Sequence, residues 1–239
     1  MRINFQPQNI TFQRIKMVDN KGVKIANDFE FRADDKKYTR YGAVFSSYEK
    51  HNYNNYKINI ENDDIGMAAD QEIALYPDLN YMFIDSMNST QESKGLGTCM
   101  HLLNIIEMFE NQINNIDLLS ASSAIPFHTR LGFYPCDKWE NGLSENMERI
   151  VKNNIKGLET YTKSADRLLK SKLSNEEKTV FGNKLLFDYT KAAINKLSKS
   201  ELEYLFLNET HMRLGKEYIL NNKNFYNDLF GKYYIDYEI

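Results

Sequence analysis

Two glycines, Gly95 and Gly97, join segments of different apolar spacing, and this junction constrains the fold more than any other feature. Residues 81–86 before it are apolar almost without interruption, which predicts a buried central strand. Residues 97–113 after it carry apolar side chains three and four positions apart, which predicts a helix with one buried face. Those positions are Cys99, Leu102, Leu103, Ile106, Phe109 and Ile113. The sequence therefore predicts a strand, a glycine loop and a helix in direct succession.

The start of this helix is a candidate anion site. A glycine loop before a helix leaves several backbone N–H groups unpaired at the positive end of the helix dipole, so phosphate is the expected ligand. Two common nucleotide motifs are excluded, because Met100 occupies the third glycine position of the dinucleotide fingerprint and no Gly-Lys-Ser/Thr of a P-loop is present. The alternative interpretation of the two glycines is a purely structural turn.

The first half of the chain is expected to be rich in strands. Short β-branched and aromatic runs are separated there by Asn, Asp and Gly, and residues 19–22 have the composition of a hairpin turn. Strands are expected at residues 10–18, 23–31, 38–48 and 56–60, whereas residues 65–75 are ambiguous.

A second strand and a short helix are expected after the long helix. Residues 116–120 form a short apolar run, and Pro126 suits the first turn of a helix that reaches Arg130. Gly132 can adopt the left-handed conformation that ends such a helix, with Phe133 packing back onto it. The predicted order is strand, glycine loop, helix, strand, short helix, strand.

The composition changes near residue 140, after which long stretches have helical spacing with almost no Gly and no Pro. Ser174 with Glu177 and Ser200 with Glu203 have the spacing of capping boxes, which places two helix starts. Helices are expected near residues 144–171, 174–197, 200–213 and 215–230. We therefore predict an α/β domain over residues 1–142 and an all-helical C-terminal domain over residues 143–239.

Composition excludes several classes of protein. The 239 residues carry 30 Lys and Arg against 33 Asp and Glu without blocks of one sign, so a nucleic-acid partner or an anionic membrane surface is not expected. No apolar run reaches the roughly 18 residues of a membrane span, and no secretory signal is apparent. Two cysteines without metal-ligand spacing and four scattered histidines argue against a metal site. A cytoplasmic location is expected, with delivery into a host cell by a non-Sec route left open.

Two segments in the right order resemble motifs of the GNAT superfamily of acyl-CoA-dependent N-acyltransferases. The pyrophosphate loop of that family has the form Gln/Arg-x-x-Gly-x-Gly/Ala, and the later stretch has the form Ala-x-x-Phe-Tyr-x-x-x-Gly-Phe. The matching positions are Gly95, Gly97, Ala124, Phe127, Gly132 and Phe133. The resemblance covers residues 80–136 and implies a mixed α/β fold with a mostly antiparallel sheet. It also implies transfer of an acetyl group from acetyl-CoA to an amine by direct attack, without a metal.

The resemblance assigns the cofactor-binding residues. The two parallel strands of the family splay apart beside the cofactor, so the end of one strand and the residues at 118–120 would bracket the pantetheine arm. Backbone N–H groups of the loop would hold the phosphates. The implied cofactor-binding residues are Phe83, Ile84, Asp85, Gln91, Ser93, Lys94, Gly95, Leu96, Gly97, Thr98 and Phe127.

The resemblance also suggests catalytic residues. His128 occupies the place of the family's tyrosine, so it is the candidate acid for the leaving thiolate, with a histidine on a surface helix as the alternative. Asp85 is the candidate base for the amine, with Glu72 as a weaker choice and a solvated strand-end aspartate as the structural alternative. Cys99 lies on the apolar stripe, so it is interpreted as a core residue and not as a nucleophile.

Three departures from the family pattern lead to a second hypothesis. Glu92 stands at the first position of the loop motif, His128 replaces the family's tyrosine and Ala121 replaces a common asparagine. In addition, no pair of helices is visible between the first strands. The acceptor in the main hypothesis is a protein lysine, a protein N-terminus or a small-molecule amine. The alternative is a catalytically silent module that binds CoA or acts as a protein-interaction scaffold.

Overall fold

The computed structural model describes residues 16–18, 24–34, 39–50, 53–62, 66–89, 95–198, 201–202, 209–233, 235 and 237–239. The chain divides into two compact units. The first unit comprises Met1–Tyr76, Ser86–Glu107 and Asn222–Ile239. The second comprises Pro77–Asp85 and Met108–Asn221.

The sheet of the first unit is an antiparallel meander. Each strand pairs with the next one along the chain, and Val18 pairs with Lys24 across the predicted first hairpin. The strands are β1 (Lys16–Val18), β2 (Lys24–Asp34), β3 (Thr39–Lys50), β4 (Tyr53–Asn62) and β5 (Gly66–Tyr76). The expected strands are confirmed where the structure describes them, while residues 10–15 and the hairpin turn lie outside the described residues. The ambiguous residues 65–75 form β5, because Ala69, Gln71 and Ile73 alternate as buried positions.

A pair of buried amides joins β5 to the long helix α1 (Leu96–Glu110) in this unit. Gln71 and Asn104 are both fully buried and exchange two hydrogen bonds, of 2.7 Å and 3.1 Å. Such mutual bonding satisfies groups whose burial would otherwise cost stability. The predicted helix is confirmed, but residues 99–108 are buried without interruption, so α1 is enclosed on all sides rather than on one face.

The sheet of the second unit contains one parallel and two antiparallel pairings. Strand β6 (Tyr81–Ser89) runs parallel to β7 (Asn115–Ser120), which pairs antiparallel with β9 (Thr210–Gly215), and β9 pairs antiparallel with β8 (Tyr134–Pro135). The strands predicted at residues 81–86 and 116–120 are therefore confirmed. Together with the first unit, these pairings confirm the expected mixed α/β class with a mostly antiparallel sheet.

The short helix between β7 and β8 also matches its prediction. The helical turn η1 (Pro77–Leu79) precedes β6. The helical turn η2 (Ser122–Ala124) follows β7, and α2 (Ile125–Arg130) comes next. Gly132 has φ of 88°, and the Phe133 N–H donates to the His128 carbonyl at 3.1 Å. Phe133 is fully buried, so it packs back onto the end of α2 as expected.

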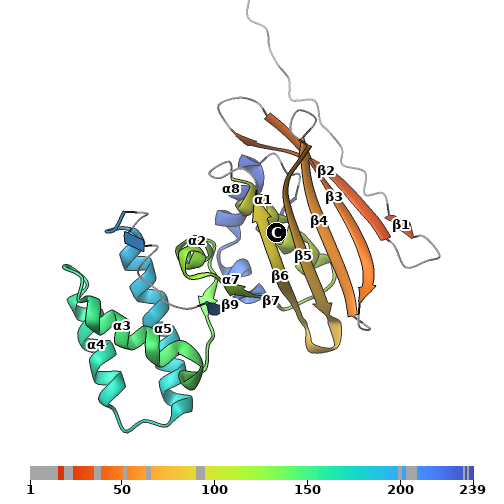
Figure 1. Cartoon of the computed structure of the whole chain (residues 1–239). Helices are drawn as coiled ribbons and strands as arrows, with labels where there is room; N and C mark the ends of the chain where they lie inside the picture. Colours follow the sequence, from red (N-terminus) through yellow and green to blue (C-terminus); the bar gives the residue numbers. More distant parts are fainter. Residues whose placement is uncertain are drawn as a thin grey trace, which may run out of the picture. The chain divides into compact units, whose positions relative to one another are not determined.

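The helical segment is inserted between two paired strands. It consists of the turn η3 (Trp139–Leu143) and the helices α3 (Ser144–Asn153), α4 (Glu159–Lys170) and α5 (Asn175–Ile194). These helices pack on one another (Figure 1). The Thr179 hydroxyl accepts a 2.9 Å hydrogen bond from the Trp139 N–H, which ties η3 to α5. Because β8 precedes this segment and β9 follows it, the helices interrupt the sheet rather than extend its end.

The expectation of an all-helical segment over residues 143–239 is therefore wrong at β9. Thr210, Met212 and Leu214 are buried and alternate with more exposed residues, which is the period of a strand and not of the predicted helix over 200–213. The domain boundary at residue 142 stays a prediction. The last two helices are α7 (Lys216–Asn221) and α8 (Lys223–Lys232).

Helix boundaries in the insertion follow local capping signals. The capping box of Ser174 and Glu177 is confirmed at the start of α5. The second predicted box, Ser200 with Glu203, lies outside the described residues. Ser198 and Glu201 instead make the reciprocal bonds of a box, at 2.8 Å and 3.4 Å. The single helix expected over 144–171 is two helices, because the chain turns through positive φ at Asn154 and Gly157.

In the part of the chain that the structure describes, no helix is long and apolar enough to cross a membrane.

Candidate functional site

The glycine turn at the start of α1 belongs to the first unit. Gly95 has φ of +80°, a conformation that favours glycine, and its carbonyl accepts the first helical hydrogen bond from the Cys99 N–H at 3.0 Å. The same carbonyl accepts a 3.0 Å hydrogen bond from the Tyr233 hydroxyl, beyond the end of α8. Helical geometry leaves the N–H groups of Leu96, Gly97 and Thr98 without intrahelical acceptors.

This arrangement provides the helix start that the anion-site prediction requires. The other predicted loop residues, Gln91, Ser93 and Lys94, lie outside the described residues, as does Glu92. Cys99 follows one turn later and is fully buried, and burial raises the pKa of its thiol. The core interpretation of Cys99 is therefore supported, since a thiol in this environment is a poor nucleophile.

In the second unit, β6 and β7 separate after four paired positions. Their parallel register runs from Tyr81 with Asn115 to Ile84 with Leu118, and both strands continue beyond the last pair. Phe83 is half-buried, Ile84 is buried and Asp85 is exposed. The strand ends thus diverge where the sequence predicted that a cofactor arm is bracketed.

His128 lies in an apolar environment on α2. Its ring makes edge contacts with the rings of Phe127 and Phe133, at centroid distances of 5.0 Å and 5.6 Å. Burial lowers the pKa of His128 to about 3, so its imidazole is neutral at neutral pH. A general acid must carry the proton that it donates, and this environment disfavours the protonated form.

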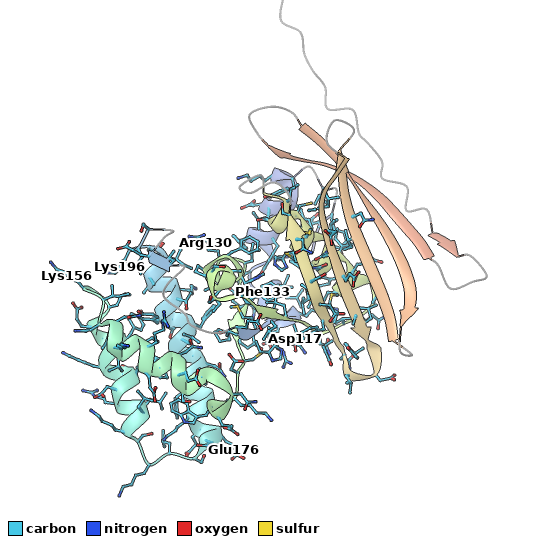
Figure 2. All side chains as sticks on the ribbon, in the orientation of Figure 1. Asp117, Arg130, Phe133, Lys156, Glu176 and Lys196 are labelled. Carbon is cyan, nitrogen blue, oxygen red and sulfur yellow. The ribbon has the colours of Figure 1, made fainter. Side chains whose placement is uncertain are left out.

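A charged cluster that the sequence interpretation missed lies on β7 and β9. Asp117 is buried, and its two oxygens accept hydrogen bonds from Arg213 Nε and Nη2 at 2.8 Å and 2.7 Å. His211 Nε2 lies 3.3 Å from Asp117 Oδ2. Burial alone would raise the pKa of Asp117, but the bonds from Arg213 and the proximity of His211 outweigh it and lower this pKa. Side chains of this unit are drawn in Figure 2, where Asp117 and Phe133 are labelled.

A signal for this cluster was present in the sequence. Asp117 interrupts an otherwise apolar strand, and a buried carboxylate requires a cation or several hydrogen-bond donors. The partners were not evident because Arg213 lies 96 positions further along the chain. Pairing of β7 with β9 brings the two side chains onto one face of the sheet.

Residues after β8 complete the surroundings of His211. The His211 N–H donates to Asp137 Oδ1 at 3.0 Å, and the Cys136 thiol donates to the His211 carbonyl at 3.5 Å. Burial raises the pKa of Asp137 and raises the pKa of Cys136 to about 12. Cys136 is therefore a neutral thiol rather than a nucleophile. Within the described residues, no group of three or more His, Cys, Asp or Glu side chains is arranged to hold a metal ion.

The order of elements from β6 to β8 matches the resemblance. A strand, the glycine turn with α1, a parallel strand that diverges from the first, and α2 ending at Gly132 follow one another along the chain. This order of elements is the one that the resemblance to GNAT acyltransferases implies. No family model matches the chain, and no curated protein matches it.

Three solved structures are similar to parts of this chain. Tetrahymena GCN5 matches with a TM-score of 0.32 and 15% identity, over 34% of this chain and 51% of its own. The ribosomal-protein-S18-alanine N-acetyltransferase from Escherichia coli matches with a TM-score of 0.31 and 18% identity, over 37% of this chain and 57% of its own. Nourseothricin acetyltransferase matches with a TM-score of 0.34 and 11% identity, over 53% of this chain and 85% of its own. The matches to the first two thus span between half and three fifths of those proteins.

Proposed function

We propose that this chain is an acetyl-CoA-dependent N-acetyltransferase. The observation that carries the proposal is the parallel pair β6 and β7, which diverges after Ile84 and Leu118. A strand end that leaves its neighbour exposes backbone N–H and C=O groups, which are suited to bind the amide-containing pantetheine arm. The glycine turn that follows β6 in the chain begins a helix whose first N–H groups have no intrahelical acceptor, and such groups are suited to bind phosphate.

The proposed cofactor contacts are supported within each unit by different features. In the first unit, the N–H groups of Leu96, Gly97 and Thr98 are the proposed phosphate donors, together with the loop residues Gln91, Ser93 and Lys94. In the second unit, Phe83 to Asp85 and Phe127 are the proposed contacts of the thioester arm. The half-buried side chains of Phe83 and Phe127 support that assignment, since they present apolar surface that remains partly accessible.

The proposed reaction is direct attack of an amine nitrogen on the thioester carbonyl. It requires a positioned cofactor, an uncharged amine and a leaving thiolate. Exposure of Asp85 supports its proposed contact with the amine. The buried and neutral state of His128 favours a packing role over the predicted acid role. A thiolate leaves readily from a thioester, so the proposed reaction does not depend on this acid.

A catalytically silent module is the second candidate function. The observation that favours it is the same neutral His128, because the position of the family's tyrosine then lacks a group that readily gives up a proton. Such a module would bind CoA and transfer no acetyl group. Its helical insertion, from Trp139 to Ile194, would then serve as the contact surface for another protein.

Incubation with isotopically labelled acetyl-CoA tests the proposal. The full chain is mixed with a lysine-containing peptide, a peptide whose only amine is its N-terminus, and spermidine, and the products are analysed by mass spectrometry. The enzyme hypothesis predicts labelled acetyl on at least one amine, and loss of this product in Gly97→Glu, which places a carboxylate where the pyrophosphate is proposed to bind. Gly231→Glu is the matched control, since a side chain at Gly231 meets nothing within 4 Å among the described residues. Binding without transfer favours the silent module.

A further inference from the structure

We infer that His211 is the general base that deprotonates the acceptor amine, and that Asp117 positions its imidazole. The inference rests on the proposed acetyltransferase function and names a catalytic group for it. It starts from two side chains on neighbouring strands. His211 Nε2 lies 3.3 Å from Asp117 Oδ2. A carboxylate beside one imidazole nitrogen favours the tautomer whose other nitrogen can accept a proton.

Asp117 is held rigidly enough to act as a positioning residue. Its side chain is 3% exposed, and the guanidinium of Arg213 binds both of its oxygens in a bidentate arrangement. Bidentate pairing fixes the orientation as well as the charge of a carboxylate. The carboxylate also remains ionised, because Arg213 and His211 lower its pKa despite its burial. An imidazolium formed at His211 would therefore be stabilised by a fixed negative charge.

His211 is shielded at one nitrogen and accessible elsewhere. Its side chain is 36% exposed, yet Nε2 is buried and has no hydrogen bond of acceptable geometry among the described residues. The exposed part of the ring therefore comprises its other atoms, and Nδ1 is the nitrogen that can take a proton from an amine. The contact with Asp117 is therefore an electrostatic one, at 3.3 Å between Nε2 and Oδ2.

The position of His211 in the sheet links it to the proposed thioester contacts. His211 pairs with Leu119 of β7, directly after Leu118, where the register between β6 and β7 ends. Its ring centroid lies 6.4 Å from that of Phe83 on β6. His211 thus lies at the diverging strand ends of this unit, beside a residue that is proposed to contact the thioester arm.

The proposed step balances in protons and electrons. The acceptor arrives as an ammonium ion and gives one proton to His211 Nδ1, which frees the nitrogen lone pair. That pair forms the bond to the thioester carbon, and the carbon–sulfur bond breaks with its electron pair leaving on sulfur. The acylated nitrogen then loses a second proton, which passes through solvent to the thiolate. The imidazolium finally returns its proton to solvent.

Several charged and titratable groups surround His211. Asp117 on β7 and Arg213 on β9 carry opposite charges beside the ring. Asp137, which follows β8, accepts from the His211 backbone N–H, and the neutral thiol of Cys136 contacts the His211 carbonyl. Of these groups, Asp117 is the one whose carboxylate oxygen lies beside a ring nitrogen of His211, so substitution of Asp117 is the closest test of the positioning role.

The test measures kcat/KM for acetyl-CoA with spermidine and with the lysine-containing peptide between about pH 6 and pH 9. His211→Gln is expected to lower kcat/KM by about 10²-fold near neutral pH and to remove the rising low-pH limb of the profile. The affinity for acetyl-CoA, measured by calorimetry, should stay within about twofold of the wild type, since the amine step follows cofactor binding. Asp117→Asn should shift the low-pH limb while the protein remains folded by circular dichroism.

Asp188→Asn is the matched control for Asp117→Asn, because Asp188 forms an exposed ion pair with Lys184 on α5, and its profile should be that of the wild type. The base role is overturned if the pH profile of His211→Gln keeps the low-pH limb and its kcat/KM falls by less than about threefold. If the low-pH limb disappears in Asp85→Asn while the profile of His211→Gln is that of the wild type, the base role belongs to Asp85 and not to His211. A wild-type chain that transfers to none of the three acceptors, including the peptide whose only amine is its N-terminus, overturns the proposed function and the base role together.

Discussion

Substitution of Gly95 probes the turn on which the proposed phosphate site depends. Gly95 has φ of +80°, which costs alanine about 1–2 kcal/mol in free energy of unfolding. A Cβ there would also collide with the Tyr233 hydroxyl, while the ring carbons Cζ and Cε1 lie 3.2 Å and 3.3 Å from it. Displacing the hydroxyl loses its 3.0 Å bond to the Gly95 carbonyl, a loss of about 1 kcal/mol. Gly95→Ala is thus expected to cost about 2–3 kcal/mol in total.

Two further variants separate these contributions. Gly142 has φ of +100°, and a Cβ at this position would meet nothing within 4 Å among the described residues, so Gly142→Ala measures the backbone cost alone, about 1–2 kcal/mol. Tyr233→Phe removes the hydroxyl and should cost about 1 kcal/mol, because the Gly95 carbonyl keeps its bond from the Cys99 N–H. The double variant should cost about 1 kcal/mol less than the sum of the single variants, since phenylalanine relieves the collision.

Urea unfolding followed by circular dichroism gives these free energies. Equal destabilisation by Gly95→Ala and Gly142→Ala, together with additivity in the double variant, would refute the claim that Tyr233 fixes the glycine turn.

Three more outcomes follow from a buried histidine, a close-packed glycine and a helix cap. Because burial lowers the pKa of His128 to about 3 while an unfolded histidine titrates near 6.5, the stability from its neutral form is complete above about pH 6.5 and is lost as pH falls toward 3. Wild-type protein should therefore lose about 2 kcal/mol more stability than His128→Leu between about pH 7 and pH 5, and identical pH dependence would contradict this. Gly182→Val should cost about 2 kcal/mol in thermal unfolding because a Cβ there lies 2.9 Å from Leu143 Cδ2, whereas Gly231→Val, with open space, should be nearly neutral. Ser174→Ala should cost about 1 kcal/mol by loss of the α5 capping box, and an unchanged melting temperature would argue against that cap.

Local patterns were sufficient to predict most elements of this fold. Apolar runs bounded by turn residues located β6 and β7, and spacing of three and four located α1, because burial of a strand or a helix imposes its own period on the sequence. The glycine at position 132 was predicted from local chemistry alone, since only a left-handed residue ends α2 in this way.

Pairings between distant segments were not predictable from such patterns. Strand β9 is six residues long and follows a helical segment, so its alternation was too short to distinguish from helical spacing. The place of the helices between β8 and β9 depends on the pairing of Tyr134 with Arg213, which no local signal specifies. The contact of Asp117 with Arg213 and His211 depends on a second long-range pairing, that of β7 with β9.

The candidate site was predictable to a similar extent. The glycine turn and the diverging strand end at Asp85 follow from local sequence and the resemblance. The environment of His128 does not, because its neutral state depends on packing between the rings of Phe127 and Phe133. A motif position can therefore identify where a residue lies in a fold without specifying its protonation state.

The proposed binding of acetyl-CoA at the glycine turn is tested most directly by calorimetric titration of acetyl-CoA into the full chain and into Gly97→Glu. We expect saturable binding by the wild type and none by the folded variant. At about 100 times the dissociation constant, the ligand should stabilise the wild type by about 2.7 kcal/mol, a rise of several degrees in Tm. Absence of binding heat and of any thermal shift at millimolar acetyl-CoA, or equal binding by Gly97→Glu, would contradict acetyl-CoA binding at this turn.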